Sequence, residues 1–253
     1  MAQVVNGEKA SMSSYSRQNR FKNQDSMADI KSSNCDETNM GNSSNEHTSK
    51  GRVTWNSHKM KSMRDSTRLG SSLHGTNLST LMTNTNYGIV VGIEITNWTK
   101  YHLTEPKTKT YSGYISTPAV SVRPGHKEAM IVHKHGYTMT GSSGIVSWLI
   151  ENKKRRIAIV WKSPYFRSNS VGICVTTVGN ETQDDSWFNV ISNKQQDEKL
   201  KYKFSTFSDT SDEIMIEDND FQLFGSMGTS SKPEVKITLR PTMTHDLSIT
   251  KPQ

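Results

Sequence analysis

Long apolar runs are missing from this sequence. No stretch of about 18 consecutive apolar residues occurs in the 253-residue chain, so we expect no helix that crosses a bilayer. The chain starts without a basic region followed by an apolar one, so we expect no secretory signal. Cysteine is scarce: Cys35 lies in a polar stretch and Cys174 in an apolar one, which argues against a disulfide and fits a reducing compartment. These absences predict a cytoplasmic protein or one bound peripherally to a membrane.

Motifs of catalysis and cofactor binding are missing too. The sequence has no glycine-rich phosphate loop, no Gly-x-Ser-x-Gly elbow and no Cys-x-x-Cys pair. Its 8 histidines are scattered. His133 and His135 alternate along one stretch, but no Cys, Asp or Glu stands at ligand spacing beside them. We therefore predict no enzyme activity, no cofactor and no metal site.

Apolar residues are unevenly distributed. Only 32% of the chain is hydrophobic, and the shortage is concentrated in residues 1–50, which are rich in Ser, Asn and charged residues. Such a segment buries too little apolar surface to offset the entropy lost on ordering. We predict a disordered or weakly ordered polar arm over residues 1–84, a β-sandwich domain over residues 85–241, and a loose C-terminal tail over residues 242–253.

Charge is also unevenly distributed. Residues 100–167 hold twelve Lys or Arg against three Glu, whereas residues 181–220 hold four Lys against eleven Asp or Glu. One domain that contains both segments has a basic end, suited to anionic lipid headgroups or to nucleic acid. The alternative is that these charges lie on solvated turns and strand edges.

Three apolar runs of strand length lie within residues 140–175. Each is rich in β-branched and aromatic residues and has no helical period. Charged residues 151–156 join the first two runs, which predicts a hairpin with a solvated turn. Pro164 is expected to end the second strand, because proline has no N–H for the ladder.

Further short strands are predicted on both sides of this stretch. They are expected at residues 87–97, 101–104, 112–115, 119–123, 129–132, 201–207, 214–217, 221–224 and 235–239. Residues 182–194 are the one good helix candidate, with Thr182 as N-cap and a one-sided apolar stripe that includes Phe188. Short strands with few helices between them predict an all-β sandwich or barrel.

Several short patterns stand in a definite order. Met139-Thr140-Gly141 precedes the hairpin and Ser163-Pro164-Tyr165 follows it; residues 91–97 read Val-Gly-Ile-Glu-Ile-Thr-Asn and residues 235–239 read Val-Lys-Ile-Thr-Leu. In this order the chain resembles the actinoporins and their relatives, membrane-binding pore-forming proteins built on one β-sandwich. The resemblance covers about residues 87–240. It implies an actinoporin-like β-sandwich with one short flanking helix.

The resemblance also implies a lipid site. Actinoporins hold a phosphocholine headgroup in a shallow pocket, with the quaternary ammonium against tyrosine faces, and they form homo-oligomers on membranes. Pro164 and Tyr165 match that pattern, but many of the aromatic positions are replaced. The positions carried over are Ser143, Lys162, Pro164, Tyr165, Phe166, Arg167 and Phe188.

Loss of aromatic faces predicts a change of headgroup. Lys162 and Arg167 repel a quaternary ammonium and attract phosphate, so we hypothesise a shift from zwitterionic to anionic lipid. A basic patch of Lys153, Lys154, Arg155 and Arg156 is expected to add about 1 kcal/mol per residue at a charged surface. The alternatives are that Tyr165 and Phe166 only close one end of the sandwich, and that the four basic residues form a solvated turn or a nucleic-acid patch. We expect no nucleic-acid partner, since no aromatic RNA-binding motif accompanies them.

The segment before the first strand departs from the family. Actinoporins carry a long amphipathic helix there, which lines the pore, whereas residues 51–85 show no sustained apolar helical face. This departure argues against pore formation and leaves the sandwich intact. We predict peripheral binding to phospholipid headgroups; the alternative is an intracellular module that binds a protein or glycan.

Overall fold

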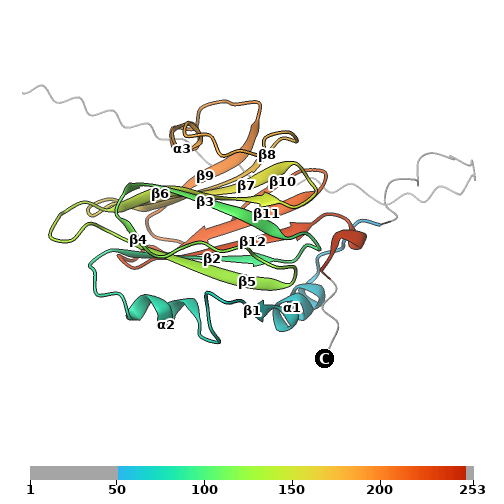
Figure 1. Cartoon of the computed structure of the whole chain (residues 1–253), viewed down its shortest axis with the longest axis horizontal. Helices are drawn as coiled ribbons and strands as arrows, with labels where there is room; N and C mark the ends of the chain where they lie inside the picture. Colours follow the sequence, from blue (N-terminus) through green and yellow to red (C-terminus); the bar gives the residue numbers. More distant parts are fainter. Residues whose placement is uncertain (1–50, 249–253) are drawn as a thin grey trace, which may run out of the picture. The chain divides into compact units, whose positions relative to one another are not determined.

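Two β-sheets packed face to face form the folded part of the chain (Figure 1). The computed structural model describes residues 51–248, so the predictions for residues 1–50 and 249–253 lie outside the described residues. The first sheet consists of β1 (Arg68–Leu69), β2 (Val90–Asn97), β4 (Tyr114–Thr117), β5 (His126–His133), β10 (Ile214–Glu217), β11 (Phe221–Met227) and β12 (Glu234–Pro241). The second consists of β3 (Leu103–Ser112), β6 (Ser142–Ile150), β7 (Arg155–Ser163), β8 (Asn169–Thr176) and β9 (Leu200–Phe207).

Strand order follows the chain closely in the second sheet and less so in the first. The second sheet runs β3-β6-β7-β8-β9 with antiparallel pairs throughout. The first runs β1-β5-β2-β12-β11-β10, with β4 also paired to β5 and with β2 parallel to β12. The prediction of an all-β sandwich is confirmed.

The main core lies between the sheets. Because side chains alternate along a strand, Ile157, Ile159 and Trp161 of β7 face this core, while Ala158 and Val160 face outward and pack with α3 (Trp187–Ser192). Strand β7 is therefore apolar on both faces, since each face is covered. The short flanking helix predicted from the sequence is thus present, on the outer face of the second sheet.

Cys174 lies on the same outward face, beneath α3, and is fully buried. Burial raises the pKa of the Cys174 thiol, because the thiolate would lose its hydration. In a Cys35→Ser variant we expect Cys174 to react with a thiol reagent at least a hundredfold more slowly than in urea-unfolded protein. Equal rates would show that the α3 face is open.

Residues 51–84 are ordered, and the prediction of a weakly ordered arm is wrong for them. Helix α1 (Ser57–Ser66) is capped by Asn56 and helix α2 (Leu78–Thr83) by Asn77. Leu73, Leu78 and Met82 pack on Val90, Ala129 and Ile131 of the first sheet. They gave little signal in the sequence, because Leu73 docks from a turn and Leu78 and Met82 share a face of a helix only six residues long.

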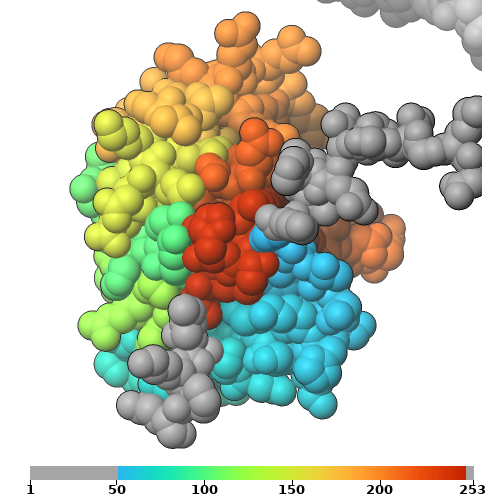
Figure 2. Space-filling model, turned by 90° about the vertical axis from the view of Figure 1, so that its right-hand side faces the viewer, coloured from blue at the N-terminus to red at the C-terminus, as the bar shows by residue number. Residues whose placement is uncertain are grey.

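The predicted loose tail is ordered as far as residue 248, and this prediction too is wrong. Leu247 packs with Met63 and Trp98, and Asp246 accepts a 2.7 Å hydrogen bond from Tyr101 and pairs with Lys100. Figure 2 shows the N-terminal described residues, in blue, packed beside this C-terminal segment, in red. The segment is polar in sequence, but these contacts and backbone hydrogen bonds, such as that from the Ser248 amide to the Trp98 carbonyl, hold it in place.

Three local predictions are also corrected. Residues 119–123 form no strand and contribute only a bridge between Val122 and Leu103. Separate strands were predicted at residues 101–104 and 112–115, whereas β3 runs without a break from Leu103 to Ser112 and contains Pro106 at a shift of register. The helix predicted over residues 182–194 begins only at Trp187, and Thr182 does not cap it. Asp184 instead accepts a 2.7 Å bond from the Ser186 amide, which lowers the pKa of the Asp184 carboxyl.

Candidate functional site

The site lies at one end of the sandwich, which we call the tip. The tip holds loops 134–141 and 164–168, at the left of Figure 1, and the opposite end, the base, holds turns 151–154 and 218–220. Strand β7 ends at the tip after Ser163, as predicted from Pro164. Because β6 and β8 pair with β7 in antiparallel register, Ser142 and Asn169 also lie at the tip.

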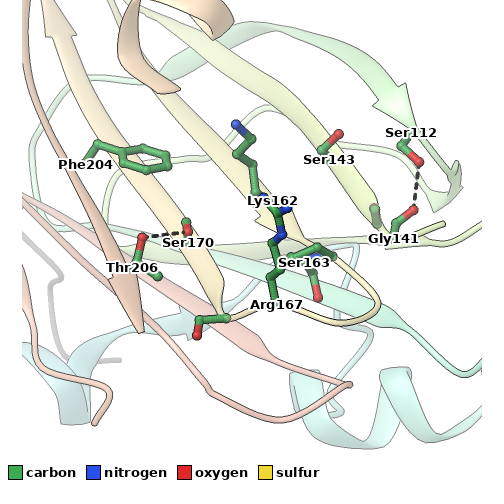
Figure 3. A pocket seen from close by; sticks show the side chains of 12 residues that line it. Ser112, Gly141, Ser143, Lys162, Ser163, Arg167, Ser170, Phe204 and Thr206 are labelled. Atoms are coloured by element: carbon green, nitrogen blue, oxygen red, sulfur yellow. Dashed lines mark hydrogen bonds between the residues drawn. The ribbon is translucent and has the colours of Figure 1, made fainter. Parts of the chain in front are cut away.

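A row of polar residues crosses the second sheet at this end. Residues paired across neighbouring strands project from the same face of a sheet. Ser112 pairs with Ser143, Ser143 with Lys162, Lys162 with Ser170, and Ser170 with Thr206. Figure 3 shows Lys162 flanked by Ser143 on one side and by Ser170 and Thr206 on the other. Five strands thus present four hydroxyl groups and one ammonium on one outer face.

This row is the floor of a pocket of about 540 Å³. Its wall is formed by the two tip loops and by β9, with Gly141, Pro164, Arg167, Ser168 and Phe204. The lining contains two cations and no acidic side chain. Among residues 51–248, neither Lys162 nor Arg167 forms an ion pair. A pocket with hydroxyl donors and two unpaired cations is suited to an anion.

The loop that carries Arg167 is held in place by hydrogen bonds at its ends. Ser163 donates a 2.8 Å bond to Asn169, and Asn169 donates 2.8 Å bonds to the carbonyls of Gly228 and Ser230, in the loop that joins β11 to β12 of the other sheet. At Gly141 any Cβ would lie 2.1 Å from the Ser163 carbonyl oxygen, so only glycine lets loop 134–141 approach this closely. The pocket is therefore built on fixed backbone.

Exposed apolar side chains surround the tip. Tyr165 and Phe166 pack edge to face, with ring centroids 4.7 Å apart, and Phe166 is 77% exposed. Tyr137 and Met139, on the neighbouring loop, are also exposed. The ammonium of Lys134 lies 5.9 Å from the Tyr165 ring, which places the two loops side by side. We call Tyr137, Met139, Tyr165 and Phe166 the apolar rim.

Four of the seven predicted lipid-site residues line the pocket: Ser143, Lys162, Pro164 and Arg167. Tyr165 and Phe166 lie beside it on the rim, 46% and 77% exposed, which argues against the alternative that they only close the sandwich. Phe188 is buried on α3 rather than open to the pocket, and it touches the site only through Lys162, whose Nζ lies 5.5 Å from its ring.

Sequence reasoning missed the rest of the site. Ser112, Ser170 and Thr206 become visible only when strand register is known, because they come from three separate strands. Tyr137 and Met139 have a signal in the sequence, because they are two apolar residues in a loop between predicted strands.

The predicted basic patch does not exist as a surface. Arg155 and Arg156 are buried members of β7, and Lys153 is paired with Asp220 at 3.0 Å. Of these four basic residues, only Lys154 is exposed. The charged run 151–156 is not all turn: the turn ends at Lys154 and β7 begins at Arg155, so both arginines are buried in the strand.

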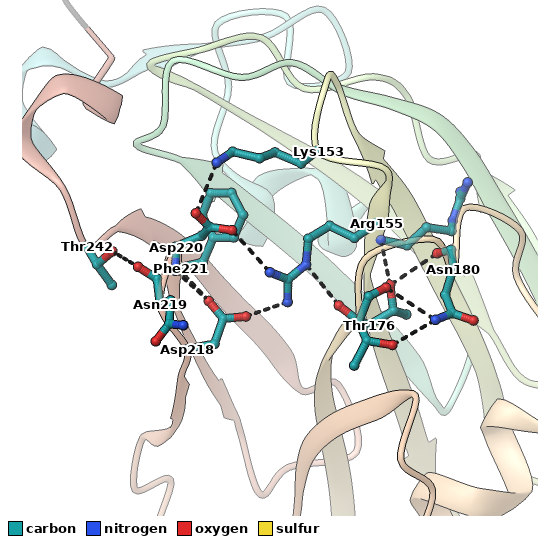
Figure 4. A network of polar contacts seen from close by, with 11 residues as sticks. Lys153, Arg155, Thr176, Asn180, Asp218, Asn219, Asp220, Phe221 and Thr242 are labelled. Atoms are coloured by element: carbon teal, nitrogen blue, oxygen red, sulfur yellow. Dashed lines mark hydrogen bonds and ion pairs between the residues drawn. The ribbon is translucent and has the colours of Figure 1, made fainter.

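Arg155 joins the two sheets at the base (Figure 4). Its guanidinium donates to Asp218, to Asp220 at 3.3 Å and to the Thr176 carbonyl at 2.9 Å. Arg156 donates to Ser147 and to the Glu181 carbonyl, and burial lowers the pKa of its guanidinium. These arginines thus have a structural role.

Two further observations concern the described residues. Among residues 51–248 no group of three or more His, Cys, Asp or Glu is placed to hold a metal ion. Helices in this part of the chain are all too short and too polar to cross a membrane. The predicted lack of enzyme activity stays a prediction.

Comparison with known proteins supplies relatives. No family model matches the chain. It is 31% identical over 175 residues to Conoporin-Cn1 of Conus consors, covering 68% of this chain and 70% of that protein. It is 33% identical over 181 residues to Tereporin-Ca1 of Terebra anilis, covering 68% of this chain and 95% of that protein. Echotoxin-2 of Monoplex parthenopeus is 27% identical over 172 residues.

A solved structure supports the fold alone. The lipid binding protein Nakanori superposes with a TM-score of 0.51 and 15% identity, covering 64% of this chain and 76% of that one. The fold that the two share is the two-sheet sandwich. With the porins above as relatives, this chain belongs to the actinoporin-like family.

Proposed function

We propose that this protein binds phospholipid headgroups at a membrane surface through the tip pocket. The observation that carries the proposal is the juxtaposition at one end of an anion-suited pocket and an apolar rim. The names of its relatives, two porins and a toxin, support membrane action, as does the lipid binding protein of similar fold.

The pocket supplies the polar half of the interaction. Lys162 and Arg167 attract a headgroup phosphate, and arginine matches phosphate oxygens with two parallel N–H bonds. Ser143 on the floor and Ser168 in the wall add hydroxyl donors. Because no acidic side chain lines the pocket, no ion pair there stabilises a cationic group.

The rim supplies the apolar half. Aromatic side chains with a polar tip are favoured at the level of the headgroups. Tyr137, Met139, Tyr165 and Phe166 lie on two adjacent loops, so one docking event brings all four into the interface. The base holds no comparable combination, because its arginines are engaged internally.

Sedimentation with dye-loaded vesicles tests the proposal. The full chain is mixed with phosphatidylserine-containing vesicles and with phosphatidylcholine–sphingomyelin vesicles, and binding and dye release are recorded together. We expect binding that weakens with salt. In a Lys162→Gln/Arg167→Gln variant, affinity for the anionic vesicles should fall about thirtyfold, at about 1 kcal/mol per cation.

A matched variant separates the pocket from net charge. Lys107→Gln/Lys154→Gln removes the same charge from exposed positions outside the tip pocket and should leave most of the affinity intact. Equal losses of vesicle affinity in both variants would show that binding depends on the net charge of the protein and not on the pocket. Absence of binding to either vesicle would reject the proposal and favour a protein- or glycan-binding module.

Dye release addresses perforation and assembly. Residues just before β2 form only the six-residue α2, so we expect binding with little release. Release that rises steeply with bound protein would contradict this expectation and would indicate homo-oligomers on the membrane.

A further inference from the structure

An aromatic pair lies outside the pocket lining, on the side of α3, and reaches the pocket only through Lys162. Phe188 stacks on Tyr111 of β3, with ring centroids 4.0 Å apart and planes 20° from parallel. Tyr111 donates a 2.9 Å hydrogen bond to the Asp185 carbonyl, which fixes the ring beside the helix. Aromatic faces attract cations, so this pair is a natural place for the positive group of a ligand.

Two lysines of the chain, Lys162 and Lys109, already lie beside the rings of this aromatic pair. The Lys162 ammonium lies 5.5 Å from the Phe188 ring centroid, and the Lys109 ammonium lies 5.4 Å from the Tyr111 centroid. Lys109 is paired with Asp185 at 2.7 Å. Lys162 has no carboxylate partner among residues 51–248 and also lines the pocket. Its positive charge is therefore available to attract an anionic ligand in the pocket.

A ligand with its own ammonium is therefore at a disadvantage here. It would have to displace Lys162 from Phe188, and it would meet two cations with no acidic side chain in the lining. A ligand that ends in a phosphomonoester gains instead, because that group carries about −1.5 to −2 charges at neutral pH and three acceptor oxygens. A phosphodiester in the same pocket offers one charge.

We propose that Lys162 acts as a built-in ammonium and makes the pocket specific for phosphomonoester headgroups. This inference rests on the function proposed above and names its ligand class. The same chemistry occurs in a lipid such as phosphatidate and in a soluble phosphomonoester such as glycerol 3-phosphate. The tip location of the pocket, beside the apolar rim, favours the lipid.

Vesicle binding at matched surface charge tests this inference. The full chain is titrated with vesicles that contain phosphatidate, phosphatidylserine or phosphatidylcholine alone, the first two adjusted to the same surface potential. We expect at least tenfold tighter binding to phosphatidate than to phosphatidylserine. Glycerol 3-phosphate in solution should compete only weakly, because it lacks the bilayer that receives the rim.

Variants at Lys162 assign the preference to this residue. Lys162→Ser frees the Phe188 face, and we expect the phosphatidate preference to disappear and phosphatidylcholine binding to rise. Lys162→Arg keeps the charge and should retain the preference. Lys154→Ser removes a charge at the base and should change neither the phosphatidate preference nor phosphatidylcholine binding. Thermal unfolding of each variant confirms that it is folded.

The outcomes separate the two proposals. No vesicle binding by the unmodified chain rejects the proposed function. Binding to phosphatidate and phosphatidylserine with equal affinity, or an unchanged preference in Lys162→Ser, overturns the inference about Lys162 and leaves the function standing. Glycerol 3-phosphate binding as tight as phosphatidate vesicles would show that the ligand is soluble and would overturn the lipid assignment.

Discussion

Replacement of Arg155 by alanine will lower the free energy of unfolding by about 3–5 kcal/mol. Arg155 is buried, and its guanidinium bridges β7 to Asp218 and Asp220 in the turn between β10 and β11 of the other sheet. Its removal leaves a largely buried Asp218 carboxylate without its cation and leaves the Thr176 carbonyl without its donor. Urea unfolding followed by tryptophan fluorescence measures the change as a shift in midpoint.

The neighbouring residue provides the control. Lys154→Ala removes an exposed cation from the same turn and should change stability by less than about 0.5 kcal/mol. In the absence of urea, neither variant should alter vesicle binding, since both residues lie at the base. A small effect of Arg155→Ala, together with weaker vesicle binding, would restore the surface patch that the sequence had suggested.

Removal of the apolar rim will abolish most of the membrane affinity. When Tyr137, Met139, Tyr165 and Phe166 are all replaced by alanine, we expect affinity for anionic vesicles to fall at least a hundredfold. Partial burial of each side chain in the interface contributes about 1 kcal/mol, and four such terms exceed the 2.7 kcal/mol that a hundredfold change requires. Stability should be unaffected, because these side chains are exposed in the free protein.

Exposed apolar residues elsewhere serve as the comparison. Val178 lies beyond the base end of β8, and Met215 lies on β10; both are exposed. A Val178→Ala/Met215→Ala variant should bind vesicles like the unmodified chain. If the rim variant retains its affinity, electrostatic attraction alone accounts for binding and the rim has no part in it.

The strands were predictable because their signals are local. Apolar runs on either side of the charged turn gave β6, β7 and β8, and Pro164 gave the end of β7. The carried-over residues Ser143 and Lys162 proved to be register partners on the pocket floor. Other members of the floor, such as Thr206, depend on a pairing between distant strands that no local pattern encodes.

Errors arose where tertiary contacts decide the outcome. Arg155 and Arg156 have the composition of a solvated turn, and only the carboxylates and carbonyls brought by other elements make their burial favourable. Residues 51–84 lack a helical apolar face, yet Leu73 and Met82 are held by the first sheet. Phe188 was expected to face a ligand, but packing against Tyr111 turns it toward the chain's own lysine.

The most direct test of the account asks which end of the sandwich meets the membrane. An environment-sensitive fluorophore is attached to Phe166→Cys or to Lys154→Cys in a Cys35→Ser background, where buried Cys174 should remain unlabelled. On phosphatidate vesicles that carry a lipid-borne quencher, we predict a blue shift and strong quenching at position 166 and no change at position 154. Quenching at position 154 with none at 166 would contradict the account, because it would place the base, and not the pocket, on the bilayer.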